Sequence, residues 1–283
     1  MQYADNRDFR AQMYRAYAIR ASEFDHQTGS GQDNMPLINK ILQLRLEAAQ
    51  ILGYQNYAEV SLATKMATSP QQVLDFLKKL AIKAKPYATK DLQALQQFAS
   101  ETLNLQTLEA WDLAYVSEKL QQARYDFSDQ EIKLYFPEDR VLAGMFGLVE
   151  KMYGIHISQV FEARQVERWN PDVKFFDIHD SSGQLIGQFY LDLYARSSKR
   201  GGAWMDEAIV RRRIDNKETG KDDIQIPVAY LTCNFSAPIK VDGQLRQALF
   251  THNEVIVLFH EFGHGLHHLL TKVEDLGVSG ING

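Results

Sequence analysis

The stretch "LFHEFGHGLHHLL", residues 258–270, places four histidines and one glutamate in an otherwise apolar segment. His260 and His264 are four residues apart, so on an α-helix they lie on one face with Cβ atoms about 5–6 Å apart. Zinc accepts imidazole nitrogen at about 2.0–2.1 Å, and two histidines at this spacing can share one ion. Glu261 lies beside the first histidine, rotated by about 100° around the helix. The spacing predicts a His-Glu-x-x-His site in which His260 and His264 bind zinc and Glu261 is the general base.

This set of residues is typical of hydrolysis by water. Zinc lowers the pKa of its water to about 7, and a carboxylate next to it removes the proton and later delivers it to a leaving amine. The alternative interpretation is a histidine pair that only fills a core. We disfavour it because two imidazoles and a carboxylate are costly to bury without partners.

Other candidate ligands lie near the pair. His267 and His268 follow it closely, but three successive ligands on one helix would place the outermost about 10 Å apart. We therefore expect these two histidines to pack or to orient their neighbours. Glu274 is ten residues past His264, about 15 Å along a continuous helix. Glu274 and Asp275 are thus expected to be solvated turn residues, and no third zinc ligand is expected in this chain.

The elements that position the site fall into two segments. Residues 1–165 carry apolar side chains at helical spacing and are predicted to form a helical scaffold. Within it, Ser69-Pro70 is predicted to begin a helix that Pro86 kinks or ends, because proline lacks the N–H and clashes with the preceding turn. Thr251 and Glu254 have the spacing of a capping box, which predicts that the histidine helix begins at this point.

Residues 166–283 are predicted to be the catalytic segment, with a small antiparallel β-sheet before the histidine helix. The runs "VKFFDIHD" and "LIGQFYLDLY" predict a hairpin, and "IPVAYLTCNF" predicts a third strand that Pro227 starts or places at an edge. Between them, "RRRIDNKETGKDD" is expected to be a charged loop. Cys233, the single cysteine, is expected to be a small buried side chain in a strand.

The composition excludes several classes of protein. The chain has 283 residues and a formal net charge of −5. Its basic residues are interleaved among acidic ones, so the sequence does not predict the basic patch that is typical of nucleic-acid binding. The N-terminus lacks the apolar core of a secretory signal, and no stretch approaches the roughly 18 apolar residues of a membrane span. We expect a soluble, cytoplasmic protein that does not bind membranes.

Several segments together resemble the thimet oligopeptidase family of zinc metallopeptidases. They are "YRAYAIRAS", "FYLDLYARSSKRGGAWM", "PVAYLTCNF" and "LFTHNEVIVLFHEFGHGLHHLLTKVEDLGVSGING". The resemblance implies a helical, zincin-like oligopeptidase fold with a deep channel, acting as a monomer on short unstructured peptides. It matches His260 and His264 to the zinc ligands and Glu261 to the catalytic base. The strand around Ala229–Asn234 is expected to pair with the peptide backbone.

The same family places a third ligand, a glutamate, on the next helix, about 25 residues after the second histidine. That position lies beyond Gly283, so we expect an internal fragment, truncated at both ends. Two hypotheses follow. In the first, the chain is part of a zinc-dependent metalloendopeptidase that hydrolyses short oligopeptides. In the second, the isolated chain is a helical scaffold or peptide-binding segment that does not catalyse.

Overall fold

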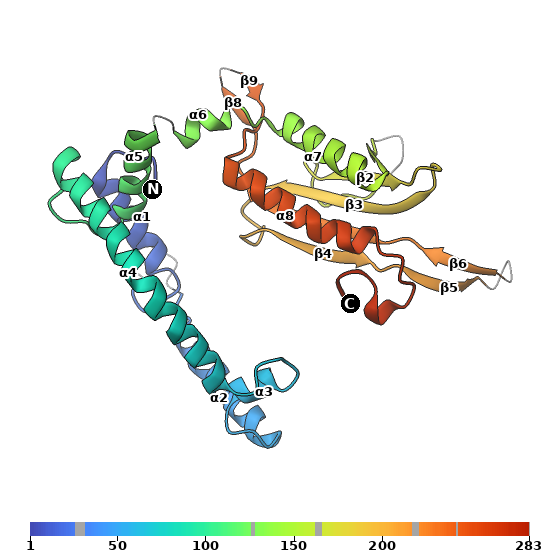
Figure 1. Ribbon diagram of the computed structural model, residues 1–283, viewed down its shortest axis with the longest axis horizontal. Helices are drawn as coiled ribbons and strands as arrows, with labels where there is room; N and C mark the ends of the chain where they lie inside the picture. Colours follow the sequence, from blue (N-terminus) through green and yellow to red (C-terminus); the bar gives the residue numbers. More distant parts are fainter. Residues whose placement is uncertain (26–31, 126–127, 162–165, 217–220, 242, 283) are drawn as a thin grey trace. The chain divides into compact units, whose positions relative to one another are not determined.

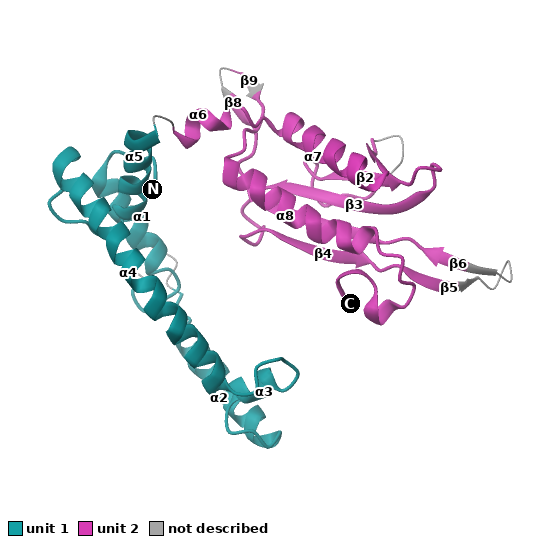
Figure 2. Ribbon diagram, in the orientation of Figure 1, with its two compact units in different colours: residues 1–127 teal, residues 128–283 magenta. Residues whose placement is uncertain are grey.

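The structure is a computed structural model that describes residues 1–25, 32–125, 128–161, 166–216, 221–241 and 243–282. It divides into two compact units, residues 1–127 and 128–283 (Figure 2). This boundary differs from the division predicted at residue 165. The helix α7 (Glu138–Tyr153) and the strand β1 (His156–Gln159) belong to the second unit, because both pack with its sheet.

The first unit is helical, as predicted, and most of its helices begin at a capping side chain. Asn6, Asn56 and Ser69 each accept a backbone N–H from the first turn of the helix that follows. The long α4 does not end at Pro86, which lies inside it; proline disturbs only one turn, and the hydrogen bonds on either side continue the helix. The helices are α1 (Arg7–Ala18), α2 (Met35–Ile51), α3 (Tyr57–Leu62), α4 (Pro70–Thr102) and α5 (Leu113–Tyr125).

The second unit combines three helices with a five-stranded sheet (Figure 1). The sheet has the order β1-β2-β3-β7-β4, and two short ribbons, β5–β6 and β8–β9, extend from it. Besides β1 and α7, the elements are α6 (Asp129–Lys133), β2 (Lys174–His179), β3 (Leu185–Tyr194), β4 (Trp204–Ile209), β5 (Arg212–Asn216), β6 (Lys221–Gln225), β7 (Val228–Phe235), β8 (Ile239–Val241), β9 (Gln244–Arg246) and α8 (His252–Leu269), followed by the 3-10 turns η2 (Leu276–Val278) and η3 (Gly280–Asn282).

The sheet is mixed, so the predicted antiparallel sheet is wrong in one respect. The hairpin of β2 and β3 is confirmed, but β3 pairs with β7 in parallel. The chain reverses twice between these strands, once into β4 and once back into β7, and the two reversals leave β3 and β7 running in the same direction. As a result β7 is paired on both sides, and β4 forms an edge of the sheet.

The segment predicted as a charged loop contains the ribbon of β5 and β6, with residues 217–220 lying outside the described residues. The prediction is wrong for the flanking residues because the ribbon extends the reversal that joins β4 to β7. The two strands carry mostly polar and charged residues, so they lack the apolar alternation by which a strand is predicted from a sequence.

The core of the second unit lies between one face of the sheet and the helices α7 and α8, which both cover that face (Figure 1). Aromatic rings join the three layers. Phe146 of α7 contacts Phe176 and Phe189 of the sheet, with centroids 5.1 and 6.1 Å away. Phe262 of α8 contacts Phe189 and Phe146, with centroids 5.4 and 5.6 Å away. This packing fixes α8 on the sheet. Among the described residues, no helix combines the length and the apolar character needed to cross a bilayer.

Candidate active site

The histidine helix α8 begins as the sequence predicts. The Thr251 hydroxyl accepts the Glu254 N–H at 3.0 Å, and the Glu254 carboxylate accepts the Thr251 N–H at 2.6 Å. This capping box satisfies two N–H groups at the helix start. The helix then runs for 18 residues to Leu269, long enough to carry all the residues predicted for the site except Glu274 and Asp275.

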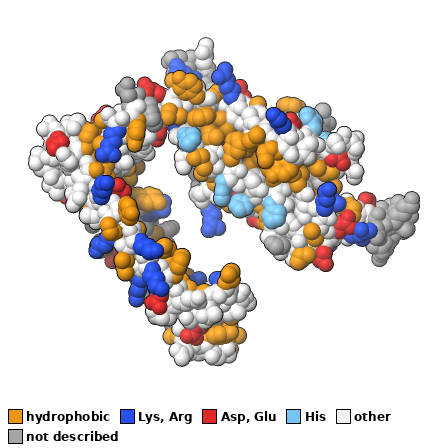
Figure 3. Space-filling view, in the orientation of Figure 1, with side chains coloured by type: hydrophobic (Ala, Val, Ile, Leu, Met, Phe, Trp, Pro, Cys, Tyr) orange, Lys and Arg blue, Asp and Glu red, His pale blue; other side chains and the backbone are white. Residues whose placement is uncertain are grey.

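His260 and His264 lie together on the outer face of α8, and both are exposed. Histidine side chains are visible on the surface over this helix in Figure 3. The two Nε2 atoms are 3.1 Å apart. Two nitrogens bound to one tetrahedral zinc ion at 2.0–2.1 Å are about 3.3 Å apart, so the separation of the pair is close to that of two ligands of one metal ion.

Glu261, next to His260 on α8 but rotated by about 100° around the helix, is buried where α8 meets the sheet. Its side chain is only 8% exposed, and its charge acts on Cys233 of β7. Burial, together with the negative charge of Glu261, raises the pKa of the Cys233 thiol to about 12. Cys233 is fully buried, as predicted. The glutamate therefore stands at the seam between the histidine helix and the sheet.

Two glycines allow close contacts along this seam. A Cβ atom on Gly265 would lie 3.0 Å from Leu231 Cδ2, so a larger residue at this position would have to push the Leu231 side chain aside. Gly280 has φ +62°, and a Cβ atom there would lie 2.7 Å from His268 Nδ1. These contacts place α8 close to β7 on one side and close to Gly280 on another.

His267 and His268 were both expected to pack or to orient their neighbours, and the structure confirms this for His268 only. His267 is exposed on the outer face of α8, beside a shallow pocket that Tyr153 of α7 also lines. His268 is fully buried, and its Nε2 lies 2.9 Å from the Ile209 carbonyl at the end of β4. A carbonyl only accepts hydrogen bonds, so Nε2 carries the proton. His268 thus packs and ties α8 to the edge strand.

Glu274 does not approach the histidine pair. Its carboxylate forms ion pairs with Arg213 and with Arg211, the latter at 3.6 Å, and its backbone carbonyl accepts the Arg213 N–H. Asp275 caps the 3-10 turn η2 by accepting the N–H of Gly277. Within the described ranges, no third histidine, cysteine or carboxylate joins the pair to make a metal-binding group.

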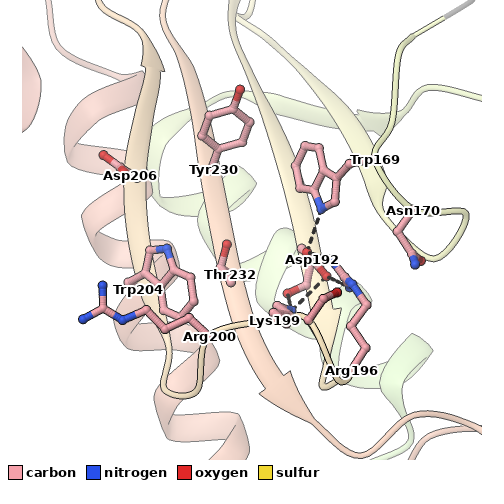
Figure 4. Close-up of a pocket in the computed structure, with 11 residues that line it drawn as sticks. Trp169, Asn170, Asp192, Arg196, Lys199, Arg200, Trp204, Asp206, Tyr230 and Thr232 are labelled. Carbon is pink, nitrogen blue, oxygen red and sulfur yellow. Dashed lines mark hydrogen bonds and ion pairs between the residues drawn. The ribbon is translucent and has the colours of Figure 1, made fainter. Parts of the chain in front are cut away.

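A pocket of about 640 Å³, which the sequence did not predict, lies on the sheet face that points away from α8 (Figure 4). Its floor consists of side chains from β3, β7 and β4. Its walls are the segment at Trp169-Asn170 and the turn 196–200 between β3 and β4. The segment "DLYARSSKR", in which three cations follow one carboxylate, is the feature of the sequence that could have indicated this pocket.

Asp192 anchors one wall of this pocket. Its carboxylate, 3% exposed, accepts hydrogen bonds from both terminal nitrogens of Arg196, at 2.8 and 2.6 Å. Lys199 Nζ and Trp169 Nε1 also donate to it, at 2.9 and 3.0 Å. Burial opposes ionisation, but these donors outweigh it, and the pKa of Asp192 lies below its ordinary value.

The sequence of the whole chain matches one protein family. Residues 1–283 match Peptidase family M3. The chain is 51% identical to Oligopeptidase A of Salmonella typhimurium and to that of Escherichia coli, each over 100% of this chain and 40% of the relative. It is 31% identical to Dipeptidyl carboxypeptidase of Salmonella typhimurium, over 98% of this chain and 38% of that protein.

The chain therefore belongs to peptidase family M3, and the resemblance found in the sequence is confirmed. It spans about 40% of the length of the oligopeptidases A that it matches. A fold that is roughly half helical with a small mixed sheet agrees with part of such a peptidase.

Proposed function

We propose that the chain forms part of a zinc-dependent metalloendopeptidase that hydrolyses short oligopeptides. The observation that carries this proposal is the His260–His264 pair, whose Nε2 atoms lie 3.1 Å apart on the exposed face of α8. Glu261 stands at the inner edge of the same helix turn, 8% exposed. Membership of a peptidase family supports the reaction class.

His260 and His264 would hold the metal through Nε2. A zinc ion held there would supply the positive charge that allows water to ionise near neutral pH and that polarises a peptide carbonyl. Glu261 would take the proton from the attacking water and pass it to the amine as the peptide bond breaks. The sheet and α8 keep most water away from its carboxylate, which strengthens its interaction with a nearby cation.

Three protein ligands are typical of a catalytic zinc site, and we propose that the third comes from outside the described residues. The relatives are longer than this chain, which spans 40% of them. The alternative function, a peptide-binding segment that does not catalyse, is favoured for the chain alone by the pairing of Glu274 with arginines.

The strand that was expected to pair with a peptide does not lie at an edge of the sheet. Pairing with Ala229–Asn234 is wrong, because β7 already lies between β3 and β4. Among the strands that the structure describes, none pairs with the outer side of β4, and this strand is tied to α8 through His268. We propose a zincin-like arrangement in which an extended peptide adds to β4 next to the histidine helix.

Zinc content after dialysis tests the metal part of the proposal. We expect His260→Ala to abolish the zinc that the chain takes up, whereas His252→Ala, an exposed histidine at the start of the same helix, leaves it unchanged. Equal zinc in both variants would place the metal elsewhere. His267→Ala is expected to behave like His252→Ala.

Hydrolysis of a quenched short peptide tests the mechanism. A protein in which the third ligand is also present and zinc is bound should cleave this peptide. In that protein, Glu261→Gln should reduce the rate of cleavage by at least about a hundredfold, the usual contribution of a general base. An unchanged rate in Glu261→Gln would refute the role of this residue. A monomeric state and a cytoplasmic location stay predictions from the sequence.

A further inference from the structure

We infer that the pocket on the sheet face away from α8 is a side-chain site for an extended peptide bound along β4. Its ligand is a peptide that carries an aromatic side chain and a carboxylate two residues apart. This inference rests on the peptide-binding part of the proposed function, and it does not depend on the metal.

The register of the sheet brings the pocket to the free edge of β4. Trp204 is opposite Thr232, and Asp206 is opposite Tyr230; all four side chains line the pocket. A strand that pairs with β4 would turn every second side chain to this same face. Those side chains would lie about 4.5–5.5 Å from Trp204 or Asp206, as cross-strand neighbours do.

The surfaces that such a side chain would meet are aromatic. Trp204, Tyr230 and Trp169 all face the pocket (Figure 4), and Trp169 is 51% exposed. Trp169 and Tyr230 are in edge contact with each other, with centroids 5.5 Å apart. An aromatic ring can stack or pack edge-on in this space, which has the volume of an ordinary ligand site.

The charges of the pocket favour a carboxylate in the ligand. The cations of Arg196 and Lys199 are already engaged by Asp192. Arg200 is exposed, and its guanidinium forms no ion pair or hydrogen bond within the part of the chain that the structure describes. It lies in the turn that leads into β4, beside Trp204 at one end of the pocket (Figure 4). An acidic side chain of the peptide at that end would neutralise it.

Intrinsic fluorescence can report occupancy, because two of the three tryptophans of the chain line the pocket. The probes are blocked hexapeptides with Phe and Glu two residues apart, and matched peptides in which Phe is replaced by Ala or Glu by Lys. Titrations use the whole chain with chelator present, so that zinc and hydrolysis play no part. We expect the Phe and Glu peptide to bind about tenfold more tightly than either matched peptide.

Two variants test the assignment. Trp204→Leu should remove the preference for Phe, and Arg200→Glu, at an exposed position, should reverse the preference between Glu and Lys. Trp111→Phe, in the first unit, is the matched control and should leave both preferences intact.

Equal affinity for all three peptides would overturn the inference, as would preferences that survive Trp204→Leu and Arg200→Glu. Failure of the proposed function has a different signature, namely loss of zinc uptake or of hydrolysis while these peptide preferences persist. The two proposals can therefore be judged separately.

Discussion

Asp192→Asn should destabilise the second unit strongly, although the substitution hardly changes the size of the side chain. The carboxylate is 3% exposed and receives hydrogen bonds from Arg196, Lys199 and Trp169. Removing its charge leaves Lys199, whose side chain is 5% exposed, with only the carbonyl oxygens of Asp192 and Tyr194 as full acceptors. A buried ammonium without a counter-charge is costly.

The expected loss is about 3 kcal/mol, at the lower end of the range for breaking a buried ion pair. Arg196 contributes little to this figure, because its side chain is 24% exposed and can turn toward water. Most of the loss therefore comes from Lys199. A second change, Lys199→Met, removes the stranded charge and should recover more than half of the lost stability in the Asp192→Asn background.

Urea unfolding measures these effects when followed by tryptophan fluorescence in a Trp111→Phe background, where the signal comes from Trp169 and Trp204 of the second unit. Asp206→Asn, an exposed carboxylate that lines the same pocket, is the control and should stay within about 0.5 kcal/mol of the parent. A loss below about 1 kcal/mol for Asp192→Asn, or no recovery with Lys199→Met, would refute the reasoning.

Three further predictions follow from the same unit. Folding lowers the pKa of Asp192 from 3.8, so the ionised carboxylate stabilises the fold fully above pH 3.8. This stabilisation is lost as the pH falls through the lower pKa of the folded state. The urea midpoint should therefore drop in this acidic range in the parent, and much less in Asp192→Asn. Gly280→Ala should lower Tm, at a cost of at least about 1 kcal/mol, because φ is +62° and the new Cβ would contact His268 Nδ1; an unchanged Tm would contradict this. Since the pKa of Cys233 rises from 9.0 to about 12, the native thiol at pH 8 should react with iodoacetamide about a thousandfold more slowly than a free cysteine, and rapid labelling of the folded chain would argue against its burial.

The sequence predicts best where the determining contacts are local. The capping box at Thr251 and Glu254 involves residues three apart, and it starts α8 as expected. The hairpin of β2 and β3 is equally local, because a short turn with Gly183 at positive φ joins strands of suitable composition. The relation between His260 and His264 also needs only helix geometry.

The features that the sequence did not predict depend on contacts between distant segments. Nothing local in β7 indicates that β4 returns to its outer side, so its place inside the sheet was missed. The pairing of Glu274 with Arg213 crosses 61 positions of the chain, and no spacing rule connects them. The pocket shares this property, since its aromatic floor and its charged wall come from different strands.

Removing metal should leave the fold of the second unit intact. The contacts that hold α8 in place are the ring cluster around Phe262, the close approach of Gly265 to Leu231 and the hydrogen bond from His268 to Ile209. All of them lie on the buried side of the helix, whereas His260 and His264 lie on its exposed side. A structural zinc site, in contrast, supplies the folding energy itself, and chelators unfold such domains. Excess chelator should therefore shift Tm by no more than the stabilisation that bound zinc adds by mass action. A collapse of the far-ultraviolet circular dichroism with chelator would mean that the metal, and not the packing of α8 on the sheet, brings the two histidines together.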